Sequence, residues 1–227
     1  MIRKWAISIV ILASVCTIIA MKTGKEEKSI KYVALGDSYT IGEGAKAGEA
    51  FPDLLVNHLK ENGINIVLSA NPSVTGWTTQ DLIEKEMPVF DRIKPAFVTL
   101  LIGVNDWVQG VDSATFHKNL SYILDHVQSG LPDKSKVLLV TIPDFGVTPT
   151  GAMYSGGRDI SRGIADFNNI IKSEANKRNL PVADIFAETQ KMKGNSELIA
   201  HDGLHPSAKE YALWEKIIYP VAYKLLK

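Results

Sequence analysis

The chain has 227 residues, of which 45% are hydrophobic and 22% charged, and its formal net charge is zero. This length suits one domain with a sizeable core. The sequence contains no run of five or six like charges, so we expect no nucleic-acid partner, because phosphate binding needs a concentrated basic face. The five His residues form no His-rich or Cys-rich tract, and we predict no metal site.

The first segment of the chain is typical of a secretory signal or a membrane anchor. Arg3 and Lys4 precede an uncharged run from Trp5 to Met21, which suits either alternative. Basic residues at the N-terminus favour a cytoplasmic location for that end. We therefore expect an extracytoplasmic protein, anchored by this segment or secreted after its cleavage. Cys16 adds a lipidation alternative, and the charged residues 22–29 are expected to form a tether.

From Ile30 onward, apolar runs alternate with helical patterns. Apolar, β-branched runs predict strands at 31–35, 64–70, 96–103, 136–142 and 180–185. Apolar spacings of three and four predict helices at 51–63, 78–90 (ending near Pro88), 113–130, 160–179 and 207–226. Because the strands are almost uniformly apolar, we predict the α/β class: a three-layer α/β/α sandwich with a flavodoxin-like, mostly parallel five-stranded sheet. This domain would span residues 30–227, after the signal or anchor and its tether at 1–29.

Four polar, glycine-bearing segments lie at corresponding places in this pattern. "GDSYT" (36–40), "NPSVTGWTT" (71–79) and "GVND" (103–106) follow the first three strands, and "DGLHP" (202–206) precedes the last helix. In open parallel sheets, ligands bind beyond the carboxyl ends of the strands. We therefore expect the four segments to meet at one edge of the sheet.

In this order the four segments resemble the blocks of the SGNH or GDSL-type hydrolase superfamily, which are led by Ser, Gly, Asn and His. The resemblance spans residues 31–226, with Tyr39 in place of the usual Leu and Ser73 where Gly is frequent. It implies a serine esterase or lipase-like enzyme that cleaves esters through an acyl-enzyme. The two departures bear on the substrate class more than on the chemistry.

The requirements of acyl transfer agree with the residues that these segments supply. A serine hydroxyl needs a base to take its proton, and His titrates near neutrality, so Ser38 is the candidate nucleophile and His205 its base. Asp202 lies three residues earlier in a glycine-containing turn, from which its carboxylate can reach the imidazole. The resemblance further implies three oxyanion donors, which are the backbone N–H groups of Ser38 and Gly76 and the side-chain amide of Asn105.

The other titratable residues near these segments are expected to have structural roles. We expect Asp37 to form the turn by accepting local N–H groups, and Asp106 to cap or brace the third loop. His201 and His205 are four residues apart. The glycine and proline of "DGLHP" prevent the helix that would align both on a metal.

Substrate contacts are predicted from position alone. Tyr39, Trp77 and Trp107 each lie beside a motif residue and are candidate pocket residues, with packing elsewhere as the alternative. The long glycine-rich segment 143–159 follows the fourth strand, and such loops are often functional. It covers the substrate or is a surface excursion, and it offers three apolar candidates: Phe145, Met153 and Tyr154.

Other functions are alternatives to ester hydrolysis. "GEGAKA" (42–47) fits a dinucleotide-binding spacing, but Gly36 to Ile41 separate it from the first strand, whereas that motif begins directly after the strand. We therefore predict no cofactor. An acyltransferase would share the acyl-enzyme, and a membrane-tethered binding module would need no activated serine. The expected substrate is a small-molecule, lipid or carbohydrate ester. The sequence does not choose among carboxylester, thioester, lysophospholipid and O-acetyl carbohydrate substrates, nor does it give the chain length.

Overall fold

The computed structural model describes residues 28–227. The predicted apolar run with Cys16, and all of the tether but its last two residues, lie outside the described residues. Among the residues that are described, no helix is both long enough and apolar enough to cross a membrane.

Five parallel strands form one sheet in the order β2-β1-β3-β4-β5. The strands are β1 (Ile30–Gly36), β2 (Ile66–Ala70), β3 (Phe97–Leu101), β4 (Val137–Val140) and β5 (Val182–Ala183). This order is the flavodoxin-like one, which confirms the predicted fold class. Every residue of β3 and β4 is buried, which explains why these strands lack alternating polar positions.

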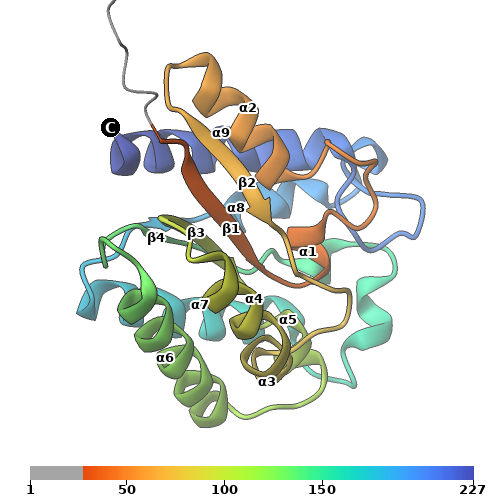
Figure 1. Cartoon of the computed structure of the whole chain (residues 1–227). Coiled ribbons are helices and arrows are strands. Elements are labelled where there is room, and N and C mark those ends of the chain that lie inside the picture. The colour runs from red at the N-terminus through yellow and green to blue at the C-terminus, as the bar shows by residue number, and fades with distance from the viewer. Residues whose placement is uncertain (1–27) are drawn as a thin grey trace, which may run out of the picture.

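Helices cover both faces of the sheet and complete three layers (Figure 1). On one face lie α2 (Phe51–Glu61), α8 (Phe186–Thr189) and α9 (Ala208–Leu226). On the other face lie α3 (Thr79–Asp81), α4 (Met87–Ile93), α5 (Val104–Val108), α6 (Ser113–Gly130) and α7 (Ile160–Lys177). The short helix α1 (Ser38–Ile41) begins directly after β1.

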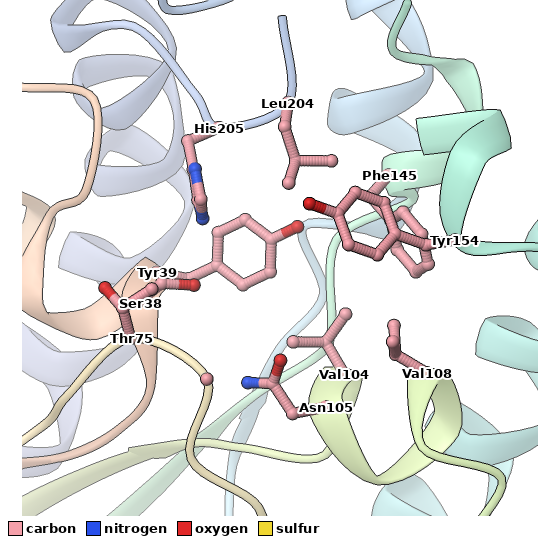
Figure 2. Close-up of a pocket in the computed structure, with 11 residues that line it drawn as sticks. Ser38, Tyr39, Thr75, Val104, Asn105, Val108, Phe145, Tyr154, Leu204 and His205 are labelled. Carbon is pink, nitrogen blue, oxygen red and sulfur yellow. The ribbon is translucent and has the colours of Figure 1, made fainter. Parts of the chain in front are cut away.

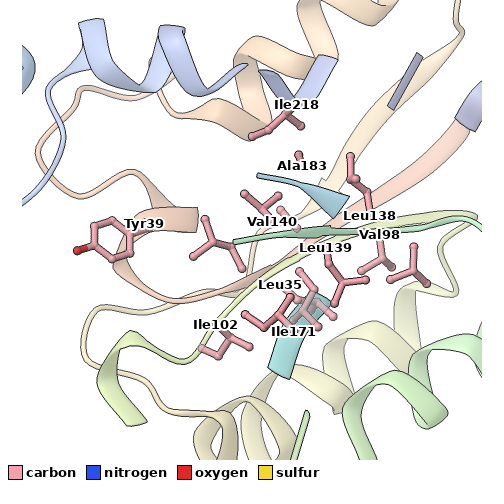
Figure 3. Close-up of a cluster of buried hydrophobic side chains, with 14 of the residues drawn as sticks. Leu35, Tyr39, Val98, Ile102, Leu138, Leu139, Val140, Ile171, Ala183 and Ile218 are labelled. Carbon is pink, nitrogen blue, oxygen red and sulfur yellow. The ribbon is translucent and has the colours of Figure 1, made fainter. Parts of the chain in front are cut away.

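The hydrophobic core lies between the sheet and these two helical layers. Figure 3 shows Ile218 of α9 on one side of β4 and Ile171 of α7 on the other. Both isoleucines are almost fully buried, and burial of such a side chain contributes about 1.5–3 kcal/mol. The apolar stripes of α7 and α9 therefore fix the sheet from both sides and hold its edge in place.

The helix that was predicted to end near Pro88 continues to Ile93 as α4. A π-helical turn, η1 (Leu82–Glu86), precedes α4 and places Pro88 in its first turn. Proline is tolerated there because the missing N–H has no partner in the helix. The same turn brings the Glu86 carboxyl group to the backbone N–H of Gly36, 3.1 Å away.

The segment 143–159 is partly helical rather than an open loop. It contains two 3₁₀ helices, η2 (Phe145–Val147) and η3 (Gly151–Tyr154). Two more short 3₁₀ helices, η4 (Gln190–Met192) and η5 (Ser196–Leu198), lie between α8 and α9.

Gly103, the first residue of "GVND", is required by the packing between β3 and α5. Its φ is +123°, and a Cβ there would lie 2.6 Å from the Phe116 ring. Gly110 also has a positive φ, +78°, but a Cβ there would meet no atom within 4 Å. We predict that Gly103→Ala lowers the free energy of unfolding by about 1–3 kcal/mol more than Gly110→Ala. Equal losses in urea titrations of the two variants would contradict this packing role.

Candidate active site

The four polar segments meet at the carboxyl edge of the sheet, around a cavity of about 190 Å³. Figure 2 shows His205 and Leu204 on one side of this cavity and the residues of α5 on the opposite side. Tyr154 and Phe145 close a third side. The lining residues are Ser38, Tyr39, Thr75, Gly76, Val104, Asn105, Val108, Phe145, Tyr154, Leu204 and His205.

Ser38 is held at the point where β1 turns into α1. The Asp37 carboxyl group caps this helix by accepting the backbone N–H of Tyr39 at 3.1 Å, which confirms the predicted turn-forming aspartate. A Cβ at Gly36 would lie 2.2 Å from the carbonyl oxygen of Leu101. Glycine therefore lets β1 and β3 approach closely just before the serine.

His205 is oriented by Asp202. Its Nδ1 lies 2.6 Å from Oδ2 of Asp202, while the other carboxylate oxygen accepts the backbone N–H groups of Leu204 and His205. Partial burial favours the neutral carboxyl, but these hydrogen bonds outweigh it, and the pKa of Asp202 lies below its ordinary value. With Nδ1 bound to the carboxylate, Nε2 is the ring nitrogen left for other partners.

Neighbouring loops hold the turn that carries His205. The backbone N–H of Thr150 donates to the carbonyl of Gly203 at 2.9 Å. A Cβ at Gly44 would lie 2.6 Å from that of Ala200 and 3.2 Å from that of His205. Gly44 therefore lets the stretch 42–47 pack closely against this turn.

The segments that carry Gly76 and Asn105 are joined by hydrogen bonds. The Asn105 amide donates one N–H to the carbonyl of Trp77 at 2.9 Å, and an amide has a second N–H to donate. Gly76 has a φ of +86°, with open space where a Cβ would stand. Asp106 accepts the backbone N–H and hydroxyl of Thr79, so it ties the third polar segment to the second rather than bracing the third loop alone.

Of the three aromatic residues predicted to line the pocket, only Tyr39 does so. Tyr39 lines the cavity, with its ring centre 5.7 Å from that of His205. Trp77 and Trp107 lie outside the lining. Trp77 contributes its carbonyl and packs beneath Lys85. Trp107 is buried behind the wall, where its ring meets Phe145 edge-on.

Within the segment 143–159, two of the three apolar candidates reach the site. Phe145 and Tyr154 line the cavity. Met153 is 82% exposed and is not among the residues that line the cavity. The segment therefore forms one wall of the cavity and is not an unrelated surface excursion.

Arg158, which the sequence did not single out, fastens this wall to α5. Its guanidinium donates to the carbonyls of Trp107 at 2.6 Å and Val108 at 3.0 Å, and it lies 3.9 Å from the centre of the Trp107 ring. Gly163 leaves the space that the tryptophan occupies, because a Cβ there would overlap the indole nitrogen. Arg158, Trp107 and Gly163 thus hold the segment 143–159 against α5, and both of these bound the cavity.

Two buried carboxyl groups lie beneath Ser38, and the sequence pattern revealed only one of them. Asp37 is fully buried, and burial raises its pKa to about 8. Burial likewise raises the pKa of Glu86 well above its ordinary value, although the Gly36 N–H opposes this. Each carboxyl has one buried oxygen without a hydrogen-bond partner among the described residues. The two carboxyl groups next to the turn at the end of β1, those of Asp37 and Glu86, therefore favour the protonated form.

No cluster of three or more His, Cys, Asp or Glu side chains in residues 28–227 is arranged to hold a metal ion. His201 is exposed and lies outside the lining of the cavity. The carboxylate beside His205 is instead its hydrogen-bond partner.

Comparison with known proteins agrees with a fold and a cavity suited to ester hydrolysis. The GDSL-like lipase/acylhydrolase family model matches residues 34–213. The chain therefore belongs to the GDSL-like lipase/acylhydrolase family and is an esterase or acylhydrolase of that family.

Individual relatives support this assignment at different levels. The chain is 33% identical over 144 residues to a multidomain esterase of Ruminococcus flavefaciens, covering 60% of this chain but only 17% of that protein. It is 23% identical to an arylesterase of Vibrio mimicus, over 79% of this chain and 82% of the relative. The crystal structure of a lipase/acylhydrolase from Enterococcus faecalis is similar with a TM-score of 0.70 and 26% identity, covering 87% of this chain and 97% of that one.

The buried carboxyl group of Glu86, on the π-helical turn, should make the stability of the fold depend on pH. Glu86 keeps its proton in the folded state at pH values where the unfolded chain has lost it. The folded state then binds more protons, so its stability falls as pH rises above the ordinary glutamate pKa of 4.5. In Glu86→Gln this decline should be smaller, because the amide does not titrate.

Glu84 provides the matched control, since it is an exposed carboxylate on the same turn. Glu84→Gln should follow the wild-type pH dependence in denaturant titrations at several pH values. A Glu86→Gln profile parallel to that of wild type would show that Glu86 is ionised in the folded state.

Proposed function

We propose that this protein is a serine esterase that hydrolyses small acyl esters through an acyl-enzyme on Ser38. The observation that carries the proposal is that Ser38, Asn105 and His205 line one cavity, while Asp202 holds the imidazole from behind. A nucleophile, a base with its orienting group, and an amide donor are the components that acyl transfer requires.

In the first step, Oγ of Ser38 attacks the ester carbonyl carbon while Nε2 of His205 takes the hydroxyl proton. Asp202 accepts the Nδ1–H and stabilises the imidazolium that forms. Its lowered pKa keeps the carboxylate ionised for this role. The electron pair of the carbonyl moves onto oxygen and creates an oxyanion.

The oxyanion receives hydrogen bonds from the backbone N–H groups of Ser38 and Gly76 and from the second N–H of Asn105. Because Asn105 already donates to Trp77, its amide is fixed before substrate arrives, and such preorganised donors stabilise developing charge. Collapse of the intermediate breaks the bond to the alcohol, which leaves with the proton from His205. Water then attacks the acyl-serine by the same route and releases the acid. An alcohol in place of water would give acyl transfer.

The dimensions of the cavity favour a small acyl group. A cavity of about 150 Å³ accommodates benzene, and this cavity measures about 190 Å³. Val104, Val108 and Leu204 give it apolar walls. The arylesterase among the relatives acts, by its name, on an aryl ester. We infer that short acyl or small aryl esters fit here, whereas a long fatty acyl chain would extend beyond the walls.

Hydrolysis of p-nitrophenyl acetate and butyrate tests this proposal directly. Ser38→Ala should lower kcat by at least about 10⁴-fold, whereas Ser69→Ala, at a serine that lies in β2, should leave it unchanged. Activity should persist in excess EDTA, because no step uses a metal. A Ser38→Ala variant that still turns over, or loss of activity with the chelator, would overturn the proposed mechanism.

Arg158 is predicted to act as a positioning residue for the cavity wall. Arg158→Ala removes the two hydrogen bonds that join the end of the segment 143–159 to α5. We expect kcat/KM for the acetate ester to fall about 10- to 100-fold, and esters from acetate to decanoate to be less sharply discriminated. Arg162→Ala, an exposed arginine four residues further along, is the control. A chain-length profile unchanged in Arg158→Ala would contradict this role.

A further inference from the structure

We propose that the face formed by the amino ends of the strands docks on an anionic lipid bilayer, with the active-site cavity opening away from it. We call this surface the amino-edge face. It comprises the lead-in to β1, the segments from the last turn of α2, α4, α6 and α7 to the following strand, and the end of α9: residues 28–31, 58–65, 90–96, 127–136, 174–181 and 223–227.

The charges of the chain are unevenly divided between this face and the rest. The amino-edge face holds eleven Lys and Arg against four Asp and Glu, whereas the remaining described residues hold ten against nineteen. A chain with no net charge is therefore folded into a strong electric dipole. Its positive end lies opposite the carboxyl edge, where α1 and α5 are located (Figure 1).

The positive charge on this face is largely unneutralised. Six exposed cations have no carboxylate partner among the described residues: Lys28, Lys60, Arg92, Lys94, Lys134 and Lys224. Three of the four acids on the face are already engaged. Asp91 pairs with His126, Asp133 with Lys136, and Glu174 with Lys177.

The partial negative charge at the carboxyl ends of helices is too small to neutralise this surplus of cations. Five helices end at the face, and each contributes roughly half a negative charge, or about two and a half in all. The excess of seven cations is well above that amount. A surface of this kind attracts anionic lipid, and each cation close to the bilayer strengthens binding.

Two further features favour a bilayer over another polyanion. Leu180, Pro181 and Leu225 of the face line an apolar depression together with the adjoining Val221, and Lys224 lies beside them. Apolar surface next to cations fits the boundary between lipid headgroups and acyl chains. The chain also enters the fold here, since Lys28 leads into β1 and 27 residues precede it. Any membrane attachment through those residues would bring this face to the lipid.

Lysine labelling on vesicles tests the orientation. The full-length chain is mixed with vesicles of phosphatidylcholine alone or with added phosphatidylglycerol, and acetylation by an amine-reactive reagent is followed residue by residue with mass spectrometry. On the anionic vesicles, Lys60, Lys94, Lys134 and Lys224 should react about fivefold more slowly than on neutral ones. About 1 M salt should restore their rates, because it shortens the screening length to roughly 3 Å.

Lys46 and Lys193, exposed lysines that lie outside the amino-edge face, are internal controls and should react equally on both kinds of vesicle. A variant with Lys60, Lys94 and Lys134 changed to Glu should lose the protection of the remaining lysines of the face. The same change at Lys118, Lys193 and Lys216, exposed lysines elsewhere, should retain it.

Three outcomes would overturn the proposal. Equal labelling on neutral and anionic vesicles would remove the electrostatic contact. Protection of Lys46 and Lys193 instead would reverse the orientation. Equal protection by heparin or duplex DNA in place of vesicles would identify a general polyanion site. None of these measurements depends on catalysis, so the esterase proposal stands or fails separately.

Discussion

The carboxyl ends of five parallel strands lie at one edge of the sheet, and the candidate site depends on this geometry. Ser38 follows β1 and Asn105 follows β3, so two residues far apart in the chain face one cavity. The strands are in turn held by apolar layers on both faces. Displacing either layer would move the strand ends and with them the side chains that must be arranged around a single ester group.

A second level of structure sets the precision of the site. Backbone hydrogen bonds and close glycine contacts hold the turn of His205 against its neighbours, and Arg158 fixes the opposite wall. These contacts involve residues that never touch a substrate. They hold the side chains in place before substrate binds, which lets hydrogen bonds act on the transition state without reorganisation. The same fold separates charge, so that the end away from the cavity carries the positive surplus.

The sequence predicted the architecture and the four converging segments because both are written in local patterns. Apolar runs mark the strands, and "GDSYT" to "DGLHP" lie at their ends. Contacts between distant segments leave no such local signal. Glu86 depends on a π-helical turn, and Trp107 is buried by a glycine 56 residues further along, at position 163. The positive charge of the amino-edge face could not be predicted for the same reason, because its cations come from six separate segments with no charged run in any of them.

The proposed mechanism requires that Oγ of Ser38 is the atom that becomes acylated. The most direct measurement is tandem mass spectrometry of the protein after reaction with a serine-directed organophosphonate, in wild type and in His205→Ala. We predict a single adduct on the peptide that contains Ser38, formed at least about 100-fold more slowly without the imidazole. An adduct on another serine, or labelling of Ser38 at an unchanged rate in His205→Ala, would contradict the account.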